Sequence, residues 1–312
     1  MAKFLVTGGS GFIGSNIVIE LVKRGHEVRV FDNFSTGRRQ NLAFYLDRLD
    51  LIEGDLRSAG VVQQAVKGVD YILHQGALPS VPRSIADPEA TTEVNVAGTL
   101  NLLMAAKDTG VKRIVLASSS SIYGDIPDEF KVETMKPSPL SPYAASKIAA
   151  EHYFQAFNRV YDLETVCLRY FNVFGPRQDP GSQYSAVIPK FIKAIQADKS
   201  PIIYGDGEQA RDFTFVENVV HANLLAIEKK NVSGQTMNIA CGEKISLLQL
   251  VELINKILGK NIKPQFQPAR AGDIKNSRAN ISKARELLNY EVQVDFETGL
   301  RRTIEWYTDT EK

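Results

Sequence analysis

The sequence has 312 residues, 44% of them hydrophobic and 23% charged, which is the composition of an ordinary globular protein with enough chain for a sizeable core. Lys and Arg number 37 against 36 Asp and Glu, so the chain lacks the strong positive field that binds nucleic acids or anionic membranes, and we expect neither as a partner. No run approaches the roughly 18 apolar residues of a membrane span, the first residues lead at once into a strand-like run that leaves no room for a signal peptide, and a cytoplasmic location is predicted.

The cysteines and histidines offer little support for a metal centre. Cys167 and Cys241 are far apart in the sequence, and the four histidines show no HExxH or similar ligand spacing. Two such cysteines supply neither a disulfide framework nor a CxxC metal site, and we interpret both as buried thiols. We therefore predict no metal.

Short apolar runs recur through the first half of the chain, and segments with apolar residues at helical spacing separate them. Strands that alternate with helices predict a parallel sheet covered on both faces. Crossovers between parallel strands are right-handed almost without exception, so the predicted fold class is α/β with a doubly wound sheet. The predicted strands are Phe4–Val6, Val28–Phe31, Leu51–Ile52, Tyr71–Leu73, Ile114–Leu116 and Thr165–Leu168.

After about residue 171 the alternation weakens, and Pro and Gly become frequent. This change predicts a second, smaller and loop-rich lobe at the C-terminal end. Helical patterns over 247–258 and 296–307 would supply its core. The predicted division assigns to the sheet domain residues 1–170 with a returning segment near 205–230, and to the lobe 171–204 and 231–312.

Three glycines follow the first predicted strand at GxxGxxG spacing, in Thr7-Gly8-Gly9-Ser10-Gly11-Phe12-Ile13-Gly14. In this context Gly8 would permit a tight turn, Gly11 would let the backbone approach a pyrophosphate, and Gly14 would let the helix pack on the strand. The helix N-terminus would offer unpaired N–H groups to the anion. The motif predicts a Rossmann-like dinucleotide-binding domain, with Phe12 and Ile13 also in contact with the cofactor.

The second strand ends in Phe31-Asp32-Asn33, where a ribose-binding carboxylate is expected. Asp32 would accept hydrogen bonds from the ribose hydroxyls and repel a 2′-phosphate, so we predict NAD, while Arg38 and Arg39 nearby keep NADP open. Asp55 could reach the adenine amine, although a helix cap is an equal alternative. The remaining predicted cofactor contacts are Asn33, Leu56, Gln75, Ala77 and Asn95.

The stretch ASSSSIYG follows the strand at Ile114–Leu116, and YAASK begins 24 residues after Ser119. The YxxxK spacing puts Tyr143 and Lys147 on one helix face. A lysine ammonium and an oxidised nicotinamide would both favour the phenolate, so Tyr143 is the predicted general base. Ser119 would stabilise the charge that develops on the same substrate hydroxyl. YxxxK alone more often reflects helix packing, but the glycine motif favours catalysis.

With TGGSGFIG, Asp32, Asp55, SSSSIYG and YAASK in this order, nearly the whole chain resembles the extended short-chain dehydrogenase/reductase family and, within it, the nucleotide-sugar 4-epimerases. The resemblance implies bound NAD and catalytic roles for Ser119 and Tyr143, with Lys147 also holding the nicotinamide ribose. It implies Ser120 as a neighbouring substrate contact. It also implies a homodimer through two helices of each subunit, one of which carries Tyr143.

The resemblance further implies a nucleotide-sugar site in the second half of the chain. Asn172 and Arg211 would contact the diphosphate, and Arg270 would do so from a segment that also contains Asp273. Val187 lies in a segment similar to the one that contacts uridine. The guanidinium fork matches phosphate geometry, and a chain of net charge +1 must hold an anion with local charges. Taken singly, Asn172 would be a turn residue and each arginine a surface residue.

Ser277 aligns with a position that lines the sugar pocket in the hexose epimerases. A small residue there leaves room for an N-acetyl group, which favours UDP-GlcNAc and UDP-GalNAc and also admits UDP-glucose and UDP-galactose. The stretch 76–84 is similar to that of the N-acetylhexosamine epimerases. Ser80, Arg83 and Ser84 are therefore candidate sugar contacts, with a loop role as the alternative.

The predicted function is NAD-dependent inversion of C4 of a UDP-hexose, an isomerisation through a transient 4-keto sugar. A 4,6-dehydratase is disfavoured, because similar dehydratases carry Asp and Glu where this chain has Ser120 and Ser121. A UDP-glucuronate epimerase or decarboxylase stays open, because Arg83 or Arg270 could pair with a sugar carboxylate. A non-catalytic NAD-binding sensor is the alternative from another class.

Overall fold

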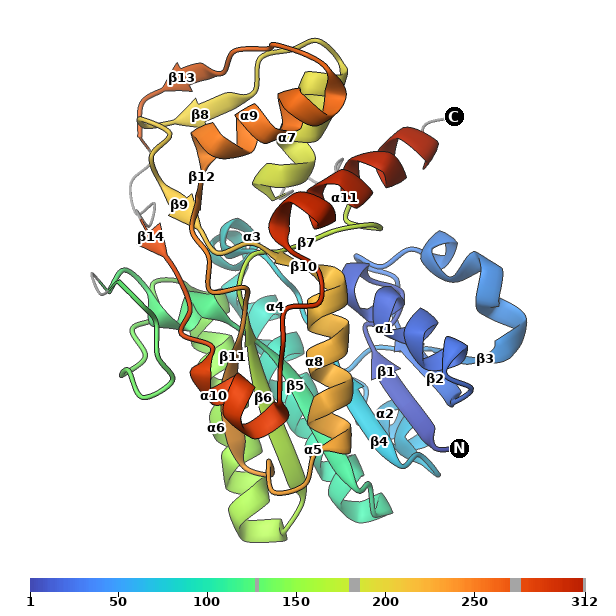
Figure 1. Ribbon diagram of the computed structural model, residues 1–312. Helices are drawn as coiled ribbons and strands as arrows, with labels where there is room; N and C mark the ends of the chain where they lie inside the picture. Colours follow the sequence, from blue (N-terminus) through green and yellow to red (C-terminus); the bar gives the residue numbers. More distant parts are fainter. Residues whose placement is uncertain (127–128, 180–185, 270–275, 311–312) are drawn as a thin grey trace.

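The computed structural model describes residues 1–126, 129–179, 186–269 and 276–310. Figure 1 shows a sheet with helices on both faces and a smaller lobe above it. Within the described residues the sheet has seven parallel strands in the order β11-β6-β5-β4-β1-β2-β3. They are β1 (Lys3–Thr7), β2 (Glu27–Asp32), β3 (Leu49–Glu53), β4 (Tyr71–His74), β5 (Arg113–Ser119), β6 (Glu164–Tyr170) and β11 (Gln235–Ile239).

The strand order reverses beside β1. The chain runs from β1 to β3 at one edge of the sheet and then crosses to β4, on the other side of β1, before it continues to β6. This reversal confirms the predicted doubly wound sheet, and each of the six predicted runs lies in one of the strands β1 to β6. Ligands of such sheets bind outside the carboxyl ends of the strands at the point of reversal.

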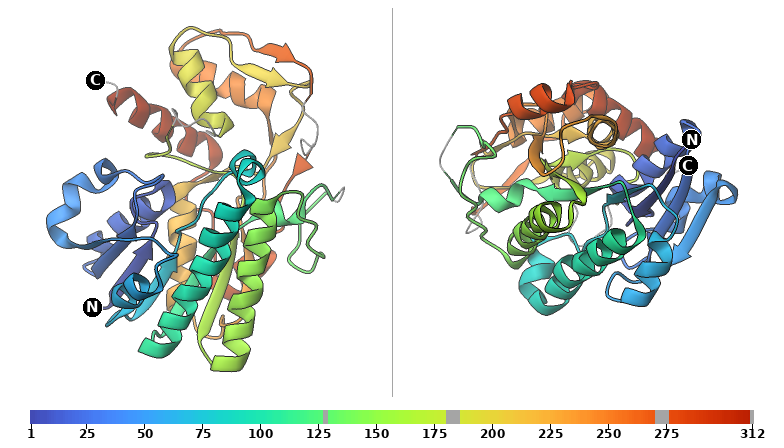
Figure 2. Two further views of the ribbon diagram at one scale, coloured as in Figure 1. Left: turned by 180° about the vertical axis from the view of Figure 1, so that it is seen from behind. Right: turned by 90° about the horizontal axis from the view of Figure 1, so that it is seen from below.

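Successive strand residues point to opposite faces and supply two separate cores. Val6 and Val115 pack with α1 and α8 on one face, whereas Leu5 and Ile114 pack with α2, α5 and α6 on the other. Seen from behind, α5 and α6 run side by side (Figure 2). The bounds are α1 (Phe12–Lys23), α2 (Ala59–Val66), α5 (Gly98–Thr109), α6 (Pro142–Tyr161) and α8 (Val216–Glu228).

The strand β11 corrects the sequence-based division, which assigned residues 231–312 to the lobe. Gln235–Ile239 pairs with β6 along its whole length, and α10 (Ser282–Leu288) packs on β11 and α8. Polar Thr236 and Asn238 interrupt the apolar pattern of this strand, yet both are buried. The Asn238 amide accepts a hydrogen bond from the Tyr123 hydroxyl, so tertiary partners satisfy a group that the sequence pattern places in a loop.

The lobe has its own aromatic core. Phe174, Phe213, Phe215 and Phe296 pack with ring centroids 5.4 to 6.4 Å apart. Around them lie the helices α7 (Val187–Gln196), α9 (Leu247–Leu258) and α11 (Phe296–Thr310). The helix α9 has the predicted bounds, with a Ser246 capping box before it and left-handed Gly259 after it. The helix α11 begins at the predicted residue and runs one turn further.

Short strands connect the lobe to the sheet domain. The pairs are β7 (Val173–Phe174) with β10 (Thr214–Phe215) and β8 (Ile202–Tyr204) with β13 (Gln265–Gln267), and β9 (Ala210–Arg211) lies between β12 (Ile245–Ser246) and β14 (Asn276–Ser277). The remaining short elements are η1 (Arg39–Arg48), α3 (Val81–Ala86), α4 (Pro88–Thr92), η2 (Glu93–Ala97) and η3 (Ser120–Tyr123). Over the part of the chain that the structure describes, we find no helix with the length and apolar character needed to cross a membrane.

Candidate active site

Three adjoining cavities lie between the carboxyl ends of the strands and the lobe. The sheet cavity, of about 300 Å³, is lined by residues that follow β1 to β6, among them Gly8, Asp32 and Gln75. The junction cavity, of about 490 Å³, is lined from η3, α6 and the lobe, and the lobe cavity, of about 610 Å³, lies beside α7. Tyr143 lines both the sheet and junction cavities, and Arg211 lines both the junction and lobe cavities. The three therefore form one continuous site.

The glycine motif forms a backbone cradle at the floor of the sheet cavity. Gly8 has a φ of +64°, and a Cβ there would lie 2.7 Å from the backbone nitrogen of Gly76. A Cβ on Gly14 would overlap the carbonyl oxygen of Gly8. Gly11 caps α1 without a side-chain hydrogen bond. Bare backbone and a helix N-terminus without a side-chain cap fit the pyrophosphate of a dinucleotide, and side chains in these places would fill the space.

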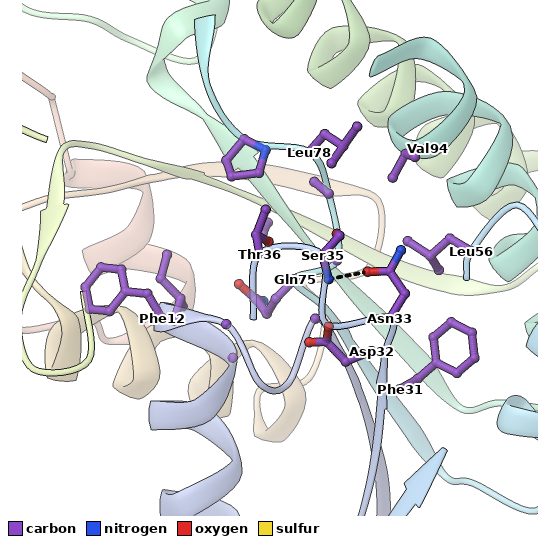
Figure 3. A pocket seen from close by; sticks show the side chains of 18 of the residues that line it. Phe12, Phe31, Asp32, Asn33, Ser35, Thr36, Leu56, Gln75, Leu78 and Val94 are labelled. Atoms are coloured by element: carbon purple, nitrogen blue, oxygen red, sulfur yellow. Dashed lines mark hydrogen bonds between the residues drawn. The ribbon is translucent and has the colours of Figure 1, made fainter. Parts of the chain in front are cut away.

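Asp32 lies at the centre of the sheet cavity, between Phe12 on one side and the apolar side chains of Leu56 and Val94 on the other (Figure 3). Its carboxylate accepts hydrogen bonds from the backbone N–H groups of Ser10 (2.9 Å) and Phe34 (2.8 Å). A carboxylate has about four acceptor positions, so this one can still accept from ribose hydroxyls.

Arg38 and Arg39, the two arginines that left NADP as an alternative cofactor, both form ion pairs with acidic side chains. Arg38 forms an ion pair with Asp179, and Arg39 pairs with Glu53 while its guanidinium lies 4.2 Å from the Phe34 ring centroid. Arginines held in this way are less available to a 2′-phosphate. The geometry around Asp32 thus agrees with the predicted preference for NAD.

The other predicted cofactor contacts divide into two groups. Asn33, Asp55, Leu56, Gln75 and Ala77 line the sheet cavity, together with Ile13 and Lys147. The Arg57 guanidinium, hydrogen bonded to Asp55, holds the pKa of that carboxyl well below its usual range, and burial opposes this effect. Asn95 lines none of the three cavities. Its amide accepts from the backbone N–H of Leu78 and donates to the Leu78 carbonyl and to Ser146, so it holds the loop that contains Leu78, and its contact with a cofactor stays a prediction.

The predicted catalytic residues meet where β5 ends and α6 begins. The Ser141 cap and Pro142 start α6 just before Tyr143, whose hydroxyl is hydrogen bonded to Ser119. The Lys147 ammonium lies 5.9 Å from the Tyr143 ring centroid and donates to the carbonyl of Ala117 at 3.0 Å. The structure thus brings together all three side chains that the sequence selected.

Burial controls the ionisation of this group. It raises the pKa of Tyr143, while the hydrogen bond with Ser119 acts in the opposite direction. It lowers the pKa of Lys147 to about 8, and the nearby Glu151 carboxylate opposes that change. Burial thus disfavours the phenolate of Tyr143, whereas a nearby positive charge would favour it.

The junction cavity brings together most of the predicted substrate contacts. Ser80, Ser119, Ser120, Tyr143, Asn172, Arg211 and Ser277 all line it, and Val187 lines the lobe cavity. Ser277 pairs with Arg211 in the parallel β14–β9 register, which explains their proximity. Ser80 and Asn172 have φ values of +112° and +34°, unusual for residues with a Cβ. Backbone strain of this kind concentrates at ligand sites.

Four predicted substrate contacts have a different position or lie outside the described residues. Arg83 and Ser84 line none of the three cavities; the burial of Ser84 corrects its prediction as a sugar contact, and the sugar contact of Arg83 stays a prediction. Ser84 is completely buried, and its hydroxyl donates to the carbonyl of Val81 at 2.8 Å, as expected for a helix residue. Arg270 and Asp273 lie outside the described residues.

The sequence analysis missed Asp212, which joins the lobe to the sheet. Its fully buried carboxylate accepts backbone hydrogen bonds from Cys241 (3.0 Å), Gly242 (3.0 Å) and Ala279 (3.1 Å). Burial raises its pKa to about 6. Because Asp212 follows Arg211 directly, these bonds also hold the arginine at the cavity. Only the tertiary contacts reveal this role.

Tyr170 and Lys131 also line the site without having been predicted. Tyr170, at the end of β6, lines the sheet and junction cavities, and the rule that ligands bind at strand ends could have found it. Lys131 is buried against the junction cavity, and its ammonium donates to the carbonyl of Ile126. It comes from an irregular segment with no periodic pattern. Among the described residues no three His, Cys, Asp or Glu side chains are grouped to hold a metal, and the absence of a metal stays a prediction.

Comparison with known proteins gives consistent matches along the chain. The model of the "NAD dependent epimerase/dehydratase family" matches residues 4–240. A UDP-glucose 4-epimerase of Mycolicibacterium smegmatis is 37% identical over 309 residues, 98% of each chain. The structure of UDP-N-acetylglucosamine 4-epimerase from Methanobrevibacter ruminantium M1, in complex with UDP-N-acetylmuramic acid, superposes with a TM-score of 0.95 at 40% identity and 99% coverage of both chains. UDP-glucuronic acid 4-epimerase from Bacillus cereus, in complex with UDP-glucuronic acid and NAD, has a TM-score of 0.90 at 31% identity and 99% coverage of both.

The cradle predicts a sharp response to one methyl group. We expect Gly14→Ala to lower the NAD retained by the purified protein by roughly tenfold or more, because the new Cβ overlaps the Gly8 carbonyl and must displace the turn. The NAD released on denaturation is measured by chromatography. Gly60→Ala is the control, since a Cβ at Gly60 meets nothing within 4 Å. Full retention in Gly14→Ala would contradict the cradle.

Proposed function

The chain belongs to the NAD dependent epimerase/dehydratase family, and on this premise we propose that it is a UDP-hexose 4-epimerase that keeps NAD bound through turnover. The observation that carries the proposal is the position of Tyr143. Its side chain, hydrogen bonded to Ser119, forms part of the wall between the sheet cavity and the junction cavity. One phenol can therefore face both a nicotinamide and a sugar hydroxyl.

The sheet cavity would hold the cofactor. The glycine cradle would bind the pyrophosphate, Asp32 the adenosine ribose, and Lys147 the nicotinamide ribose. When bound, NAD accepts the C4 hydride of the sugar and later returns it, so no net oxidation occurs.

Tyr143 would move the proton. In the oxidation half, its phenolate would take the proton of the C4 hydroxyl while the C4 hydrogen leaves with both bonding electrons as hydride, so that a 4-keto sugar results. Ser119 would hydrogen bond the same oxygen and stabilise its developing charge. In the second half, the Tyr143 hydroxyl gives the proton back to the C4 oxygen as hydride returns to C4. The protein ends in its starting protonation state.

Inversion requires the sugar to turn while the nucleotide stays bound. Asn172 and Arg211 line both the junction and lobe cavities, where a diphosphate between sugar and nucleoside would lie. The Asn172 amide donates to the carbonyl of Asp212 at 2.9 Å, which holds it in place. Val187 and Phe191 provide apolar walls for a base in the lobe cavity. Return of hydride to the opposite face of the rotated sugar inverts C4.

We propose UDP-GlcNAc and UDP-GalNAc as the preferred pair. The half-buried Ser277 lines the junction cavity beside Arg211, and its small side chain leaves space near the sugar. Removing side-chain volume reduces the steric penalty against an N-acetyl group. UDP-glucose and UDP-galactose would fit the same space with less contact.

UDP-glucuronate is the second candidate, for epimerisation or decarboxylation. The specific observation in its favour is Lys131, a buried cation in the wall of the junction cavity. A sugar carboxylate could bind there. Arg83, one of the two arginines considered for this role, lines none of the three cavities.

We also propose that the protein forms a homodimer through α5 and α6. These helices lie side by side on the back of the sheet (Figure 2). Their outer face exposes an apolar stripe that includes Met104 on α5 and Tyr153, Ala156 and Val160 on α6. An exposed stripe on two adjacent helices suits a symmetric four-helix contact. The cytoplasmic location stays a prediction from the sequence.

The substrate prediction is tested by proton NMR of the sugar H1 and H4 signals. The purified protein is incubated without added NAD with UDP-GlcNAc, UDP-glucose and UDP-glucuronate separately. We expect UDP-GalNAc to form faster than UDP-galactose, because the small Ser277 admits the acetyl group. Faster conversion of UDP-glucose would contradict the assignment of Ser277, and conversion of UDP-glucuronate alone would support the second candidate.

Replacing the proposed base tests the mechanism. Tyr143→Phe is expected to lower kcat by roughly 10³-fold with bound NAD retained, because only the proton acceptor is lost. Tyr161→Phe, at the exposed end of the same helix, is the matched control and should keep full activity. A Tyr143→Phe protein that kept its biological function in cells would instead support the sensor alternative.

The oligomer is tested by light scattering after size-exclusion chromatography. We expect a dimer that Ala156→Glu with Val160→Glu converts to a monomer, because two buried carboxylates in the contact would lack partners. Phe44→Glu changes a side chain that is 94% exposed far from this face and should leave the dimer intact. A monomeric parent protein would overturn the proposed contact.

A further inference from the structure

Three consecutive residues at the end of β5 are each bonded to one face of α6. The carbonyl of Ala117 accepts from the Lys147 ammonium, the Ser118 hydroxyl donates to the Glu151 carboxylate, and Ser119 is hydrogen bonded to Tyr143. The helix partners are spaced four residues apart, so they lie on one face. Two of the three bonds involve proposed catalytic groups, and the third involves Glu151, which the mechanism does not use.

Glu151 is completely buried, and a buried carboxylate is costly unless it is fully paired. Arg169 on β6 supplies the pairing, with its Nε 2.9 Å from Oε1 and its Nη2 2.7 Å from Oε2. Arg169 also donates to the Tyr123 hydroxyl at 2.9 Å. The carboxylate is thus held from two strands, by Arg169 on β6 and by Ser118 on β5.

The charge of Glu151 acts on Lys147, one helical turn away. Burial lowers the pKa of Lys147 to about 8, and Glu151 is the group that raises it. His74 on β4 also lies near Lys147. Burial, and to a smaller extent the charge of Lys147, lower the pKa of His74 to about 3, so this histidine is uncharged at neutral pH. The other titratable groups around the pair are Tyr143 on α6, Tyr123 on η3, and Cys167 and Arg169 on β6. Farther out, α3, α4, η2 and α5 pack against α6 and carry Arg83, Glu89, Glu93, Lys107 and Asp108.

We propose that Glu151 is a positioning residue for the proposed reaction. Through Ser118 it fixes the strand end that carries Ser119 to the helix that carries Tyr143, and its negative charge supports the ammonium of Lys147. The proposal rests on the proposed function for the identity of the reaction, but the bond and the charge effect can be measured without turnover.

The sign of the expected pH effect follows from the charges. Activity that needs the Lys147 ammonium is fully present below the pKa of that group and is lost as the pH rises through it. Removing the Glu151 charge is expected to lower the pKa of Lys147, because the carboxylate then no longer opposes the lowering of that pKa by burial. The loss of activity must then begin at a lower pH.

The direct test is the titration of Lys147 in the NAD-bound protein. Protein labelled with ¹³C at lysine Cε is titrated by NMR, and the Lys147 signal is assigned with Lys147→Arg. In Glu151→Gln, which keeps the shape and an oxygen acceptor for Ser118, we expect the midpoint to fall by about one pH unit. An unchanged midpoint would overturn the charge effect, whether or not the protein turns over any sugar nucleotide.

Kinetics then separate charge from positioning. In Glu151→Gln the alkaline limb of the kcat profile should move to lower pH by about the same amount as the titration. Ser118→Ala removes the bond to the strand end without removing a charge, so kcat should fall roughly tenfold with the profile unmoved. An unchanged kcat in Ser118→Ala would overturn the positioning role.

A further variant serves as the control. Glu164→Gln also removes a carboxylate paired with an arginine, Arg113, but at the far end of β6 and half exposed, so neither the midpoint nor kcat should change. If Glu151→Gln loses its NAD and unfolds, Ser118→Ala still tests the positioning role, because it leaves the buried Glu151–Arg169 ion pair in place. A parental kcat in Ser118→Ala would then overturn the proposal. A parent protein inactive on every UDP-hexose would refute the proposed function alone.

Discussion

The parallel direction of all seven strands is the constraint on which this site depends. Because every strand runs the same way, all their carboxyl ends meet at one edge of the sheet, and residues far apart in the sequence become neighbours there. Gly8 after β1, Asp32 at the end of β2, Gln75 after β4 and Tyr170 at the end of β6 all line the sheet cavity. The reversal of strand order beside β1 opens the space that they enclose.

Burial is the second determinant, because it controls the charge of the groups at this edge. Tyr143, Lys147 and Asp212 each have a pKa changed by burial first, in the direction that disfavours the charged form. The structure compensates with specific partners rather than with solvent: Ser119 for the tyrosine, Glu151 for the lysine, and three backbone N–H groups for the aspartate. A further positive charge beside this buried tyrosine would favour its ionisation.

The lobe contributes the other half of the site through a small number of connections. The Asp212 carboxylate accepts hydrogen bonds from the backbone N–H groups of Cys241 and Gly242, which follow β11, and of Ala279. Its neighbour Arg211 lies opposite Ser277 in the register of β9 and β14. The cavity-lining residues of β9 and β14 are therefore anchored to the sheet rather than to the lobe core alone. This anchoring explains how short two-residue strands can hold side chains at a cavity wall.

The sequence by itself determined the local elements and the chemistry of the cofactor site. Glycine spacing, strand runs and the YxxxK spacing depend on short-range backbone geometry, so the six strands, α9, the cradle and the group around Tyr143 could be predicted. Tertiary structure alone decided what depends on partners distant in sequence. It made Asn238 a buried strand residue whose amide is hydrogen bonded to distant partners, left Asn95 and Ser84 outside the walls of the three cavities, and brought Lys131, Asp212 and Glu151 to the site. No periodic pattern encodes such contacts, because they form only when the strand ends and the lobe meet.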